Sequence, residues 1–170
     1  MVCPTDTVYG LIADANNKKA IEKIFKIKKR SFRKQLSLFI KDFKTAEQLA
    51  VINKEQEKIL KKNWPGKLIA VFKARKKFPK GIVCDFGKIG LRIPDYKLLN
   101  ELLKNFNHPL AQSSANISGL PASNKIKEVL RQFQNKKNQP DLVIDAGNLK
   151  SSKPSRVVDF TGKRPKILRG

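Results

Sequence analysis

Apolar residues recur at helical spacing in several parts of the chain. Residues 17–30 show this pattern with a basic outer face, and the positions that share the inner face are Ile21, Ile24, Phe25 and Lys28. Such spacing predicts an amphipathic helix. Helical composition also predicts helices over residues 45–52, 53–63, 96–106 and 123–133, the last with Ser123 as its N-cap.

Short apolar runs between glycine, proline and serine residues predict strands. These runs cover residues 35–40, 67–74, 89–96, 109–113, 141–147, 156–160 and 165–169. Helices and strands alternate over most of the chain, and strands cluster at its end. This order predicts an α/β fold with a mixed rather than purely parallel sheet. No internal repeat and no long linker divides the sequence, so we expect residues 1–170 to form a single domain.

Positive charge dominates the composition. The chain has 37 Lys and Arg residues against 14 Asp and Glu residues, a formal net charge of +23. A field of this size favours polyanionic partners such as nucleic acid or nucleotides. However, 29 of the 37 basic residues are lysine, and a coding bias toward lysine and asparagine would also raise the charge. The position of the charges is therefore more informative than their total. Between Lys18 and Lys34 there are nine basic residues and one acid, Glu22.

Simple patterns argue against several classes of protein. No window approaches 18 uninterrupted apolar residues, and the segment MVCPTDTVYGL lacks the features of a signal peptide. Cys3 and Cys84 form no CxxC motif, and a single histidine argues against a Cys/His zinc site. We therefore expect a cytoplasmic protein with no membrane partner. Neither a GxxxxGK[ST] loop nor a GxGxxG helix start is present.

Hydrolase chemistry has little support in the sequence. His108 would be the histidine of any Ser-His-Asp triad, but a lone histidine beside a proline is more often a surface residue. Asp141 and Asp145 lie at the ends of a predicted strand, where capping a turn is the expected role. The remaining candidates are polar loops that follow strands, which is where open α/β sheets bind their ligands.

Two arginines lie among apolar residues. Arg92 is part of the segment GLRIP, and Arg169 is part of ILRG at the end of the sequence. An arginine in such surroundings is costly unless an anion pairs with it. Two interpretations stay open at this point: the arginines bind an anionic ligand, or each pairs with a structural aspartate.

Six segments resemble, in order, the motifs of the YrdC-like family. They are PTDTVYGL, the K-x-R of residues 28–30, WPG, GLRIP, SSANISGLPAS and SRVVDF with ILRG, and they extend from Pro4 to Gly170. The family comprises the threonylcarbamoyl-AMP synthases of tRNA modification. The resemblance implies a twisted, open mixed sheet with flanking helices and a concave, positively charged cleft.

The resemblance also implies an activity. A family member is a nucleotidyltransferase that joins L-threonine, bicarbonate and ATP into threonylcarbamoyl-AMP and releases pyrophosphate. Mg²⁺ is expected to enter with the triphosphate, and no protein metal site is expected. A partner complex then transfers the threonylcarbamoyl group to tRNA. Some members bind tRNA or double-stranded RNA, so a family member that binds RNA without adenylation is the main alternative. A carbamoyl-transfer role, as in hydrogenase maturation proteins, is a second one.

Residue roles follow from the same resemblance. No protein nucleophile or base is expected, because the amine of threonine can capture carbon dioxide and the enzyme then positions reactants and neutralises charge. The residues expected to bind threonine are Thr5, Arg92, Ser114 and Ser155. Those expected to bind ATP are Lys28, Arg30, Lys34, Asn116, Ser123, Asn124 and Arg169.

The chain departs from the family pattern at a few positions. The sequence begins three residues before PTDTVYGL, whereas family members usually have a strand and a helix there, so we expect either that part of the first strand is missing or that the start codon is wrong. Ile69 replaces a threonine that often follows WPG-x-L, which is expected to weaken a ligand contact. Ser31 and Gln35 replace prolines that are often found after K-x-R and in K-P-L. All the expected charged anchors are retained.

Overall fold

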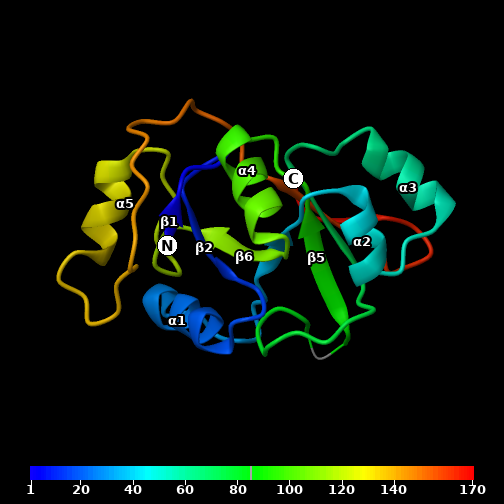
Figure 1. The fold of residues 1–170 in the computed structure, drawn as a ribbon, viewed down its shortest axis with the longest axis horizontal. Helices are drawn as coiled ribbons and strands as arrows, with labels where there is room; N and C mark the ends of the chain where they lie inside the picture. The colour runs from blue at the N-terminus through cyan, green and yellow to red at the C-terminus, as the bar shows by residue number, and fades with distance from the viewer. Residues whose placement is uncertain (85) are drawn as a thin grey trace.

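The computed structural model describes residues 1–84 and 86–170. The strands in these residues are β1 Val2–Cys3, β2 Gly10–Asp14, β3 Ser37–Phe39, β4 Leu68–Lys73, β5 Lys88–Arg92, β6 Leu110–Ser114, β7 Arg156–Asp159 and β8 Lys166–Arg169. The helices are α1 Lys18–Lys28, α2 Phe43–Leu49, α3 Lys54–Lys61, α4 Lys97–Phe106 and α5 Ile126–Phe133 (Figure 1). Within the described residues, no helix combines the length and apolar character that a membrane span requires.

The described strands form one mixed sheet. Its strand order is β1-β2-β6-β3-β5-β4-β7-β8. The pairs β3·β5 and β4·β7 are parallel, and the other neighbouring pairs are antiparallel. The predicted α/β fold with an open, mixed sheet is therefore confirmed.

The strand predicted over residues 141–147 is absent. This segment makes a single bridge to β1, between Val143 and Val2, next to a 2.8 Å hydrogen bond from the backbone N–H of Val2 to the carbonyl of Leu142. The Asp145 carboxylate then accepts a hydrogen bond from the backbone N–H of Gly147 at 2.7 Å. Because this turn diverts the chain after one bridge, the strand prediction is wrong, whereas the predicted turn-capping role of Asp145 is confirmed.

Residues 10–14 form a strand that the apolar pattern did not predict. They make up β2, which pairs with β6 along its whole length, from Gly10 opposite Ser114 to Asp14 opposite Leu110. β2 begins within the segment PTDTVYGL, at its last two residues, so its short apolar run is not separated from the preceding turn in the sequence. Pairing with a distant segment, rather than local alternation, determines this strand.

The start of α5 also differs from the prediction. The helix begins at Ile126, and its N-cap residue is Lys125 rather than Ser123. The Ser123 hydroxyl accepts a hydrogen bond from the backbone N–H of Lys125 at 3.0 Å and donates one to the Glu128 carboxylate at 2.6 Å. Ser123 therefore stabilises the turn that leads into α5 instead of capping the helix.

Two apolar clusters lie on the two faces of the sheet. The larger one joins apolar side chains of α1, α2, α3 and α5 to one sheet face, including Leu38, Ala70 and Leu91 of three neighbouring strands. The smaller one places Leu99 and Leu103 of α4 against the opposite face, where α4 lies across β2 and β6 (Figure 1). The helical residues of this second cluster come from α4, and this short helix covers only part of that face.

The rest of this second face carries small and polar side chains. Strand register places Ser37 opposite Gln112, and it places Val71 opposite both Gly90 and Asp159. Side chains that are paired across adjacent strands point to the same face. The uncovered part of the sheet is therefore a floor on which a ligand can lie.

Gly81 lies in a turn beside this floor, and the backbone geometry of the turn requires a glycine. Its φ is +99°, and an added Cβ would overlap the ring of Phe25 and come within 3.1 Å of Phe32 Cδ1. These two rings stack with centroids 4.2 Å apart. Gly81→Ala is expected to lower the free energy of unfolding by about 2–4 kcal/mol through backbone strain and overpacking, as measured by urea titration.

Gly87→Ala is the matched control for this prediction. Gly87 also has a positive φ, +67°, but no atom lies within 4 Å of an added Cβ. This variant is expected to lose only about 1 kcal/mol, because it meets backbone strain without a clash. Equal losses in the two variants would show that the aromatic pair does not restrict the turn.

Candidate functional site

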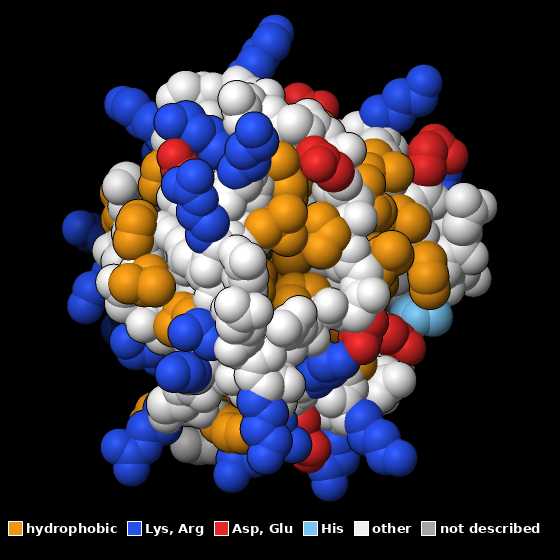
Figure 2. All heavy atoms as spheres, turned by 90° about the vertical axis from the view of Figure 1, so that its left-hand side faces the viewer, with side chains coloured by type: hydrophobic (Ala, Val, Ile, Leu, Met, Phe, Trp, Pro, Cys, Tyr) orange, Lys and Arg blue, Asp and Glu red, His pale blue; other side chains and the backbone are white. Residues whose placement is uncertain are grey.

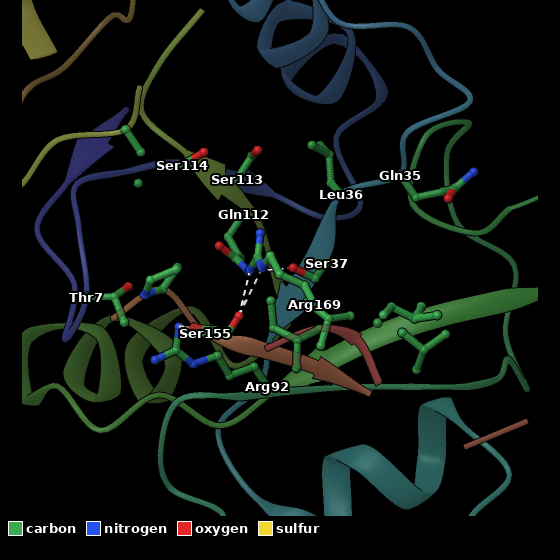
Figure 3. A pocket seen from close by; sticks show the side chains of 18 of the residues that line it. Thr7, Gln35, Leu36, Ser37, Arg92, Gln112, Ser113, Ser114, Ser155 and Arg169 are labelled. Atoms are coloured by element: carbon green, nitrogen blue, oxygen red, sulfur yellow. Dashed lines mark hydrogen bonds between the residues drawn. The ribbon is translucent and has the colours of Figure 1, made fainter. Parts of the chain in front are cut away.

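A cavity of about 700 Å³ lies on the uncovered part of the sheet. It is of the size of ordinary small-molecule sites. Figure 3 shows side chains from several strands and loops converging on it. Of the residues predicted from the sequence, those that line the cavity are Thr5, Arg30, Arg92, Ser114, Ser155 and Arg169.

Arg92 is held in place by three partners at the end of β5. Its side chain is 2% exposed, and its Nη2 donates to both oxygens of the Asp6 carboxylate at 2.5 Å. Its Nε donates to the carbonyl of Gly66 at 2.8 Å, and its Nη1 donates to the hydroxyl of Ser155 at 2.5 Å. For Arg92, the interpretation of pairing with a structural aspartate is therefore realised, although the same guanidinium also lines the cavity.

Ser155 connects Arg92 to Arg169. The hydroxyl of Ser155 accepts from Arg92, and its carbonyl accepts from Arg169 Nε at 3.1 Å and Nη2 at 2.8 Å. Figure 3 shows Arg169 reaching across the cavity to Ser155. In residues 1–84 and 86–170, no carboxylate lies within ion-pair distance of Arg169.

Arg30 approaches the same cavity from the loop after α1. Its Nε donates to the carbonyl of Lys34 at 2.7 Å, and its Nη2 donates to the carbonyl of Gln35 at 3.0 Å. Burial lowers the pKa of Arg30, and the positive charge of Arg169 lowers it further. Burial also lowers the pKa of Arg92, and Arg169 again adds to this shift while Asp6 opposes it.

The three arginines thus form a repelling cationic cluster around Arg169. Among the described residues, a carboxylate pairs with Arg92, whereas Arg30 and Arg169 bind neutral carbonyls. Such carbonyls orient a guanidinium but do not cancel its charge. An anion in the cavity would relieve the repulsion and gain charge-assisted hydrogen bonds. The cavity is therefore suited to a phosphate or carboxylate ligand.

The serine-rich turn after β6 borders the cavity. Ser114 lines the cavity and donates from its hydroxyl to Asn116 Oδ1 at 2.6 Å. Asn116 is itself buried and donates from Nδ2 to the carbonyl of Leu120 at 2.6 Å. Behind the turn, Lys28 bonds the Asn116 side chain at 3.0 Å. Burial lowers the pKa of Lys28 to about 7, and Arg30 contributes to this shift.

Five of the predicted residues do not line the cavity: Lys28 and Asn116, which lie behind the serine-rich turn, and Lys34, Ser123 and Asn124. Lys34 is exposed in the loop that Arg30 holds. Ser123 is engaged with Glu128, and Asn124 donates from Nδ2 to the carbonyl of Leu149 at 2.8 Å. Their predicted contacts with ATP therefore require a ligand that extends beyond the cavity lining.

Several polar residues of the cavity were not predicted. Gln112 of β6 donates to the hydroxyl of Ser37 of β3 on the cavity floor. Lys88 of β5 pairs with Asp159 of β7 at 2.8 Å. Ser37 and Gln112 are polar positions within otherwise apolar strands, so strict alternation along these strands could have identified them. The pairing of Lys88 with Asp159 has no such local signal.

Apolar side chains also line the cavity. The apolar residues that line it include Leu36, Ile69, Val71, Ile82 and Leu168. Ile69 lies on β4 next to Val157 of β7, so the departure from the family pattern at this position faces the ligand space. The cavity therefore combines cationic and hydroxyl side chains with apolar ones.

Other candidates from the sequence lie away from the cavity. His108 Nε2 lies 3.2 Å from the Asp14 carboxylate, and neither residue lines the cavity. Asp141 pairs with Lys23 on the surface. The described part of the chain contains no group of three or more His, Cys, Asp or Glu side chains arranged to hold a metal ion.

Comparison with known proteins finds relatives along the whole chain. Residues 1–170 match the Sua5/YciO/YrdC family, described as "Telomere recombination". The chain is 34% identical over 167 residues to the threonylcarbamoyl-AMP synthase of Pyrococcus abyssi, covering 98% of this chain and 48% of that protein. It is 31% identical over 164 residues to the threonylcarbamoyl-AMP synthase of Photorhabdus laumondii, covering 94% of this chain and 85% of that protein.

The fold is also shared with a solved structure. The crystal structure of Pyrococcus abyssi Sua5 complexed with L-threonine superimposes with a TM-score of 0.89 at 33% identity. The match covers 98% of this chain and 48% of that chain, so the chain spans about half the length of this relative.

Proposed function

The chain belongs to the Sua5/YciO/YrdC family, and on that premise we propose that it is a threonylcarbamoyl-AMP synthase. It would convert L-threonine, bicarbonate and ATP into threonylcarbamoyl-AMP and pyrophosphate. The observation that carries this proposal is the cluster of three arginines in one cavity, two of which bind carbonyls rather than carboxylates. This cluster matches a substrate pair that brings a carboxylate and a triphosphate together.

Threonine would occupy the region around Arg92. The guanidinium carries five N–H groups, and Nη1 has a second N–H besides the one given to Ser155. That N–H is suited to the carboxylate of an amino acid. Thr5 and Ser114 add hydroxyls to the same cavity. The complex of the Pyrococcus abyssi relative with L-threonine supports this choice of ligand.

ATP would bind along Arg30 and Arg169. Their charges would neutralise the triphosphate and the developing negative charge on the departing pyrophosphate. Apolar side chains that line the cavity would contact the base. Lys34, Asn116, Ser123 and Asn124 remain predicted ATP contacts at its periphery. Mg²⁺ would be carried by the triphosphate and would shield charge between phosphate groups.

The chemistry would need no protein nucleophile. The threonine amine would add to carbon dioxide derived from bicarbonate, giving a carbamate and releasing a proton to solvent. A carbamate oxygen would then attack the α-phosphorus of ATP, and the bond from that phosphorus to the bridging oxygen of pyrophosphate would break. Arg92, Arg30 and Arg169 would hold the reacting groups together, and such positioning supplies several kcal/mol of a barrier.

RNA binding is the second candidate function. The nine basic residues between Lys18 and Lys34, against the single acid Glu22, favour it. Figure 2, by contrast, shows lysine and arginine side chains spread around the edges of one face rather than gathered in a patch. Steep loss of RNA affinity with rising salt would support phosphate contacts. Transfer of the product to tRNA would require a partner enzyme complex.

The proposed reaction predicts a strict substrate requirement. Pyrophosphate release from ATP is expected only when threonine and bicarbonate are both present, because the carbamate is the attacking group. A coupled phosphate assay, with each component omitted in turn, measures this. Release that continues without threonine would indicate simple ATP hydrolysis. No release from folded protein would favour the RNA-binding function.

A further inference from the structure

Lys28 is buried at the end of α1, and its side chain is bonded to the turn that follows β6. It is 1% exposed and does not line the cavity. Its Nζ donates to the carbonyl of Ser114 at 2.5 Å, to the carbonyl of Asn116 at 2.8 Å and to Asn116 Oδ1 at 3.0 Å. An ammonium group has three N–H donors, so these three acceptors use its entire capacity.

The backbone of Lys28 holds the same turn. Its carbonyl accepts from the backbone N–H of Ser118 at 2.8 Å. The turn of residues 114–120 has further anchors, because Ile117 N–H donates to the Gln132 side chain at 2.9 Å and Ala115 N–H donates to the Tyr9 carbonyl at 2.7 Å. Lys28 is thus bonded to the turn through both its side chain and its main chain.

The Lys28 side chain also fixes the orientation of the Asn116 amide. Asn116 Oδ1 accepts from both Lys28 and the Ser114 hydroxyl, and Nδ2 donates to the carbonyls of Ile117 and Leu120. Flipping the amide would place donors against donors. Because the Ser114 hydroxyl spends its proton on Asn116, its oxygen is left to accept a hydrogen bond from a ligand in the cavity.

We propose that Lys28 is a positioning residue that holds the 114–120 turn and aims Ser114 into the cavity, rather than a direct ligand of the ATP triphosphate. This inference rests on the proposed synthase function, and it reassigns a residue whose predicted role was phosphate binding. The cavity then contacts phosphate through Arg30 and Arg169, and Lys28 acts through Asn116 and Ser114.

Protonation of Lys28 gives this role a pH dependence. Burial lowers its pKa to about 7, and Arg30 is the charged group that adds to the shift. Residues 114–120 contain no titratable side chain, Gln132 is neutral, and Tyr9 offers its carbonyl to the turn. A neutral amine has two N–H groups, so one of the three acceptors loses its donor. We expect turnover to fall as pH rises through this pKa.

Lys28→Met and Lys28→Arg test the proposal, with Lys26→Met as the matched control. Lys26 is an exposed lysine on the same helix. Lys28→Met is expected to keep the dissociation constant for ATP within about threefold of the unmodified chain and to keep its salt dependence, while kcat falls roughly 10- to 100-fold. Lys28→Arg keeps a fixed charge, so it is expected to retain part of the activity and to lose the decline near neutral pH.

Two outcomes would overturn the positioning role. If Lys28→Met weakens ATP binding and flattens its salt dependence as much as Arg30→Ala does, Lys28 contacts phosphate directly. If kcat is unchanged, the residue has no role in turnover. Should Lys28→Met fail to fold, a Lys28→Arg profile that still declines near neutral pH would contradict the proposal.

Hydrogen exchange separates this inference from the proposed function. The amides of Asn116 and Ser118 are expected to exchange at least about tenfold faster in Lys28→Met than in Lys26→Met, because they lie in the turn that Lys28 holds. This readout needs no substrate. Unchanged exchange would refute the positioning role even in an active enzyme, and faster exchange in an inactive one would leave only the proposed function refuted.

Discussion

Arg30→Ala is expected to lower kcat/KM for pyrophosphate release by about 100- to 1,000-fold. The guanidinium of Arg30 lines the cavity, and its pKa is lowered by burial and by the charge of Arg169. A half-buried cation that is repelled by a second one gains most when a polyphosphate binds, and more still when charge develops on the leaving pyrophosphate. Steady-state kinetics with varied ATP at saturating threonine and bicarbonate measure the loss.

Arg33→Ala is the control for this loss, since Arg33 is an exposed arginine of the same loop. It is expected to change kcat/KM by less than about threefold. Arg30→Lys should recover little, because one ammonium cannot reproduce the two bonds that Nε and Nη2 make to Lys34 and Gln35. Near-normal activity in Arg30→Ala would show that the arginine cluster is not the triphosphate site.

Arg92→Met is expected to reduce the free energy of unfolding by about 3–5 kcal/mol. The change leaves the Asp6 carboxylate, 8% exposed, without its cation. It also removes the donors to Gly66 and Ser155. Urea titration measures this loss, and threonine-dependent pyrophosphate release from the folded fraction is expected to disappear with it.

A second substitution separates the structural role of Arg92 from its role in binding. Asp6→Asn combined with Arg92→Met leaves no unpaired charge at these two positions, so the double variant should regain part of the lost stability. Threonine dependence should not return, because the donor for the carboxylate is still absent. A double variant that regains both would mean that Arg92 acts only through the fold. Lys88→Met, at the more exposed pair with Asp159, should cost only about 1 kcal/mol.

Local sequence signals predicted most of the helices and strands. The spacing of residues 21, 24, 25 and 28 placed Lys28 on the inner face of α1, and the structure buries it there. Strand β2 and the single bridge at residues 141–147 were not predictable in this way. Their extent depends on pairing with β6 and β1, which lie far away in the sequence, and such pairing leaves no local periodicity.

Residues of the candidate site could be predicted from the sequence where a charged side chain lies among apolar neighbours. Arg92 stands out in GLRIP because a guanidinium among apolar residues needs a partner. Its partner Asp6 lies 86 positions away, so the pairing could not be derived from spacing. Family resemblance supplied Thr5, Ser114 and Ser155, which the structure brings to the same cavity.

The side-chain contacts that the sequence did not predict join residues that only the folded sheet brings together. Lys88 lies on β5 and Asp159 lies on β7, and their side chains meet across β4, which lies between these two strands. Val71 of β4 is opposite both Gly90 and Asp159. Sequence alone does not specify strand order. The partners of Lys28 likewise follow from the fold, since Ser114 and Asn116 approach it only when β6 is paired with β2.

Isotope transfer from bicarbonate is the most direct test of the proposed activity. The protein is incubated with ATP, Mg²⁺, threonine and ¹³C-bicarbonate, and the nucleotide products are separated and analysed by mass spectrometry. The expected product is a threonylcarbamoyl adenylate that carries the label and that disappears when threonine is omitted. AMP or ADP as the only new nucleotide, with no labelled adduct from folded protein, would contradict the proposed activity.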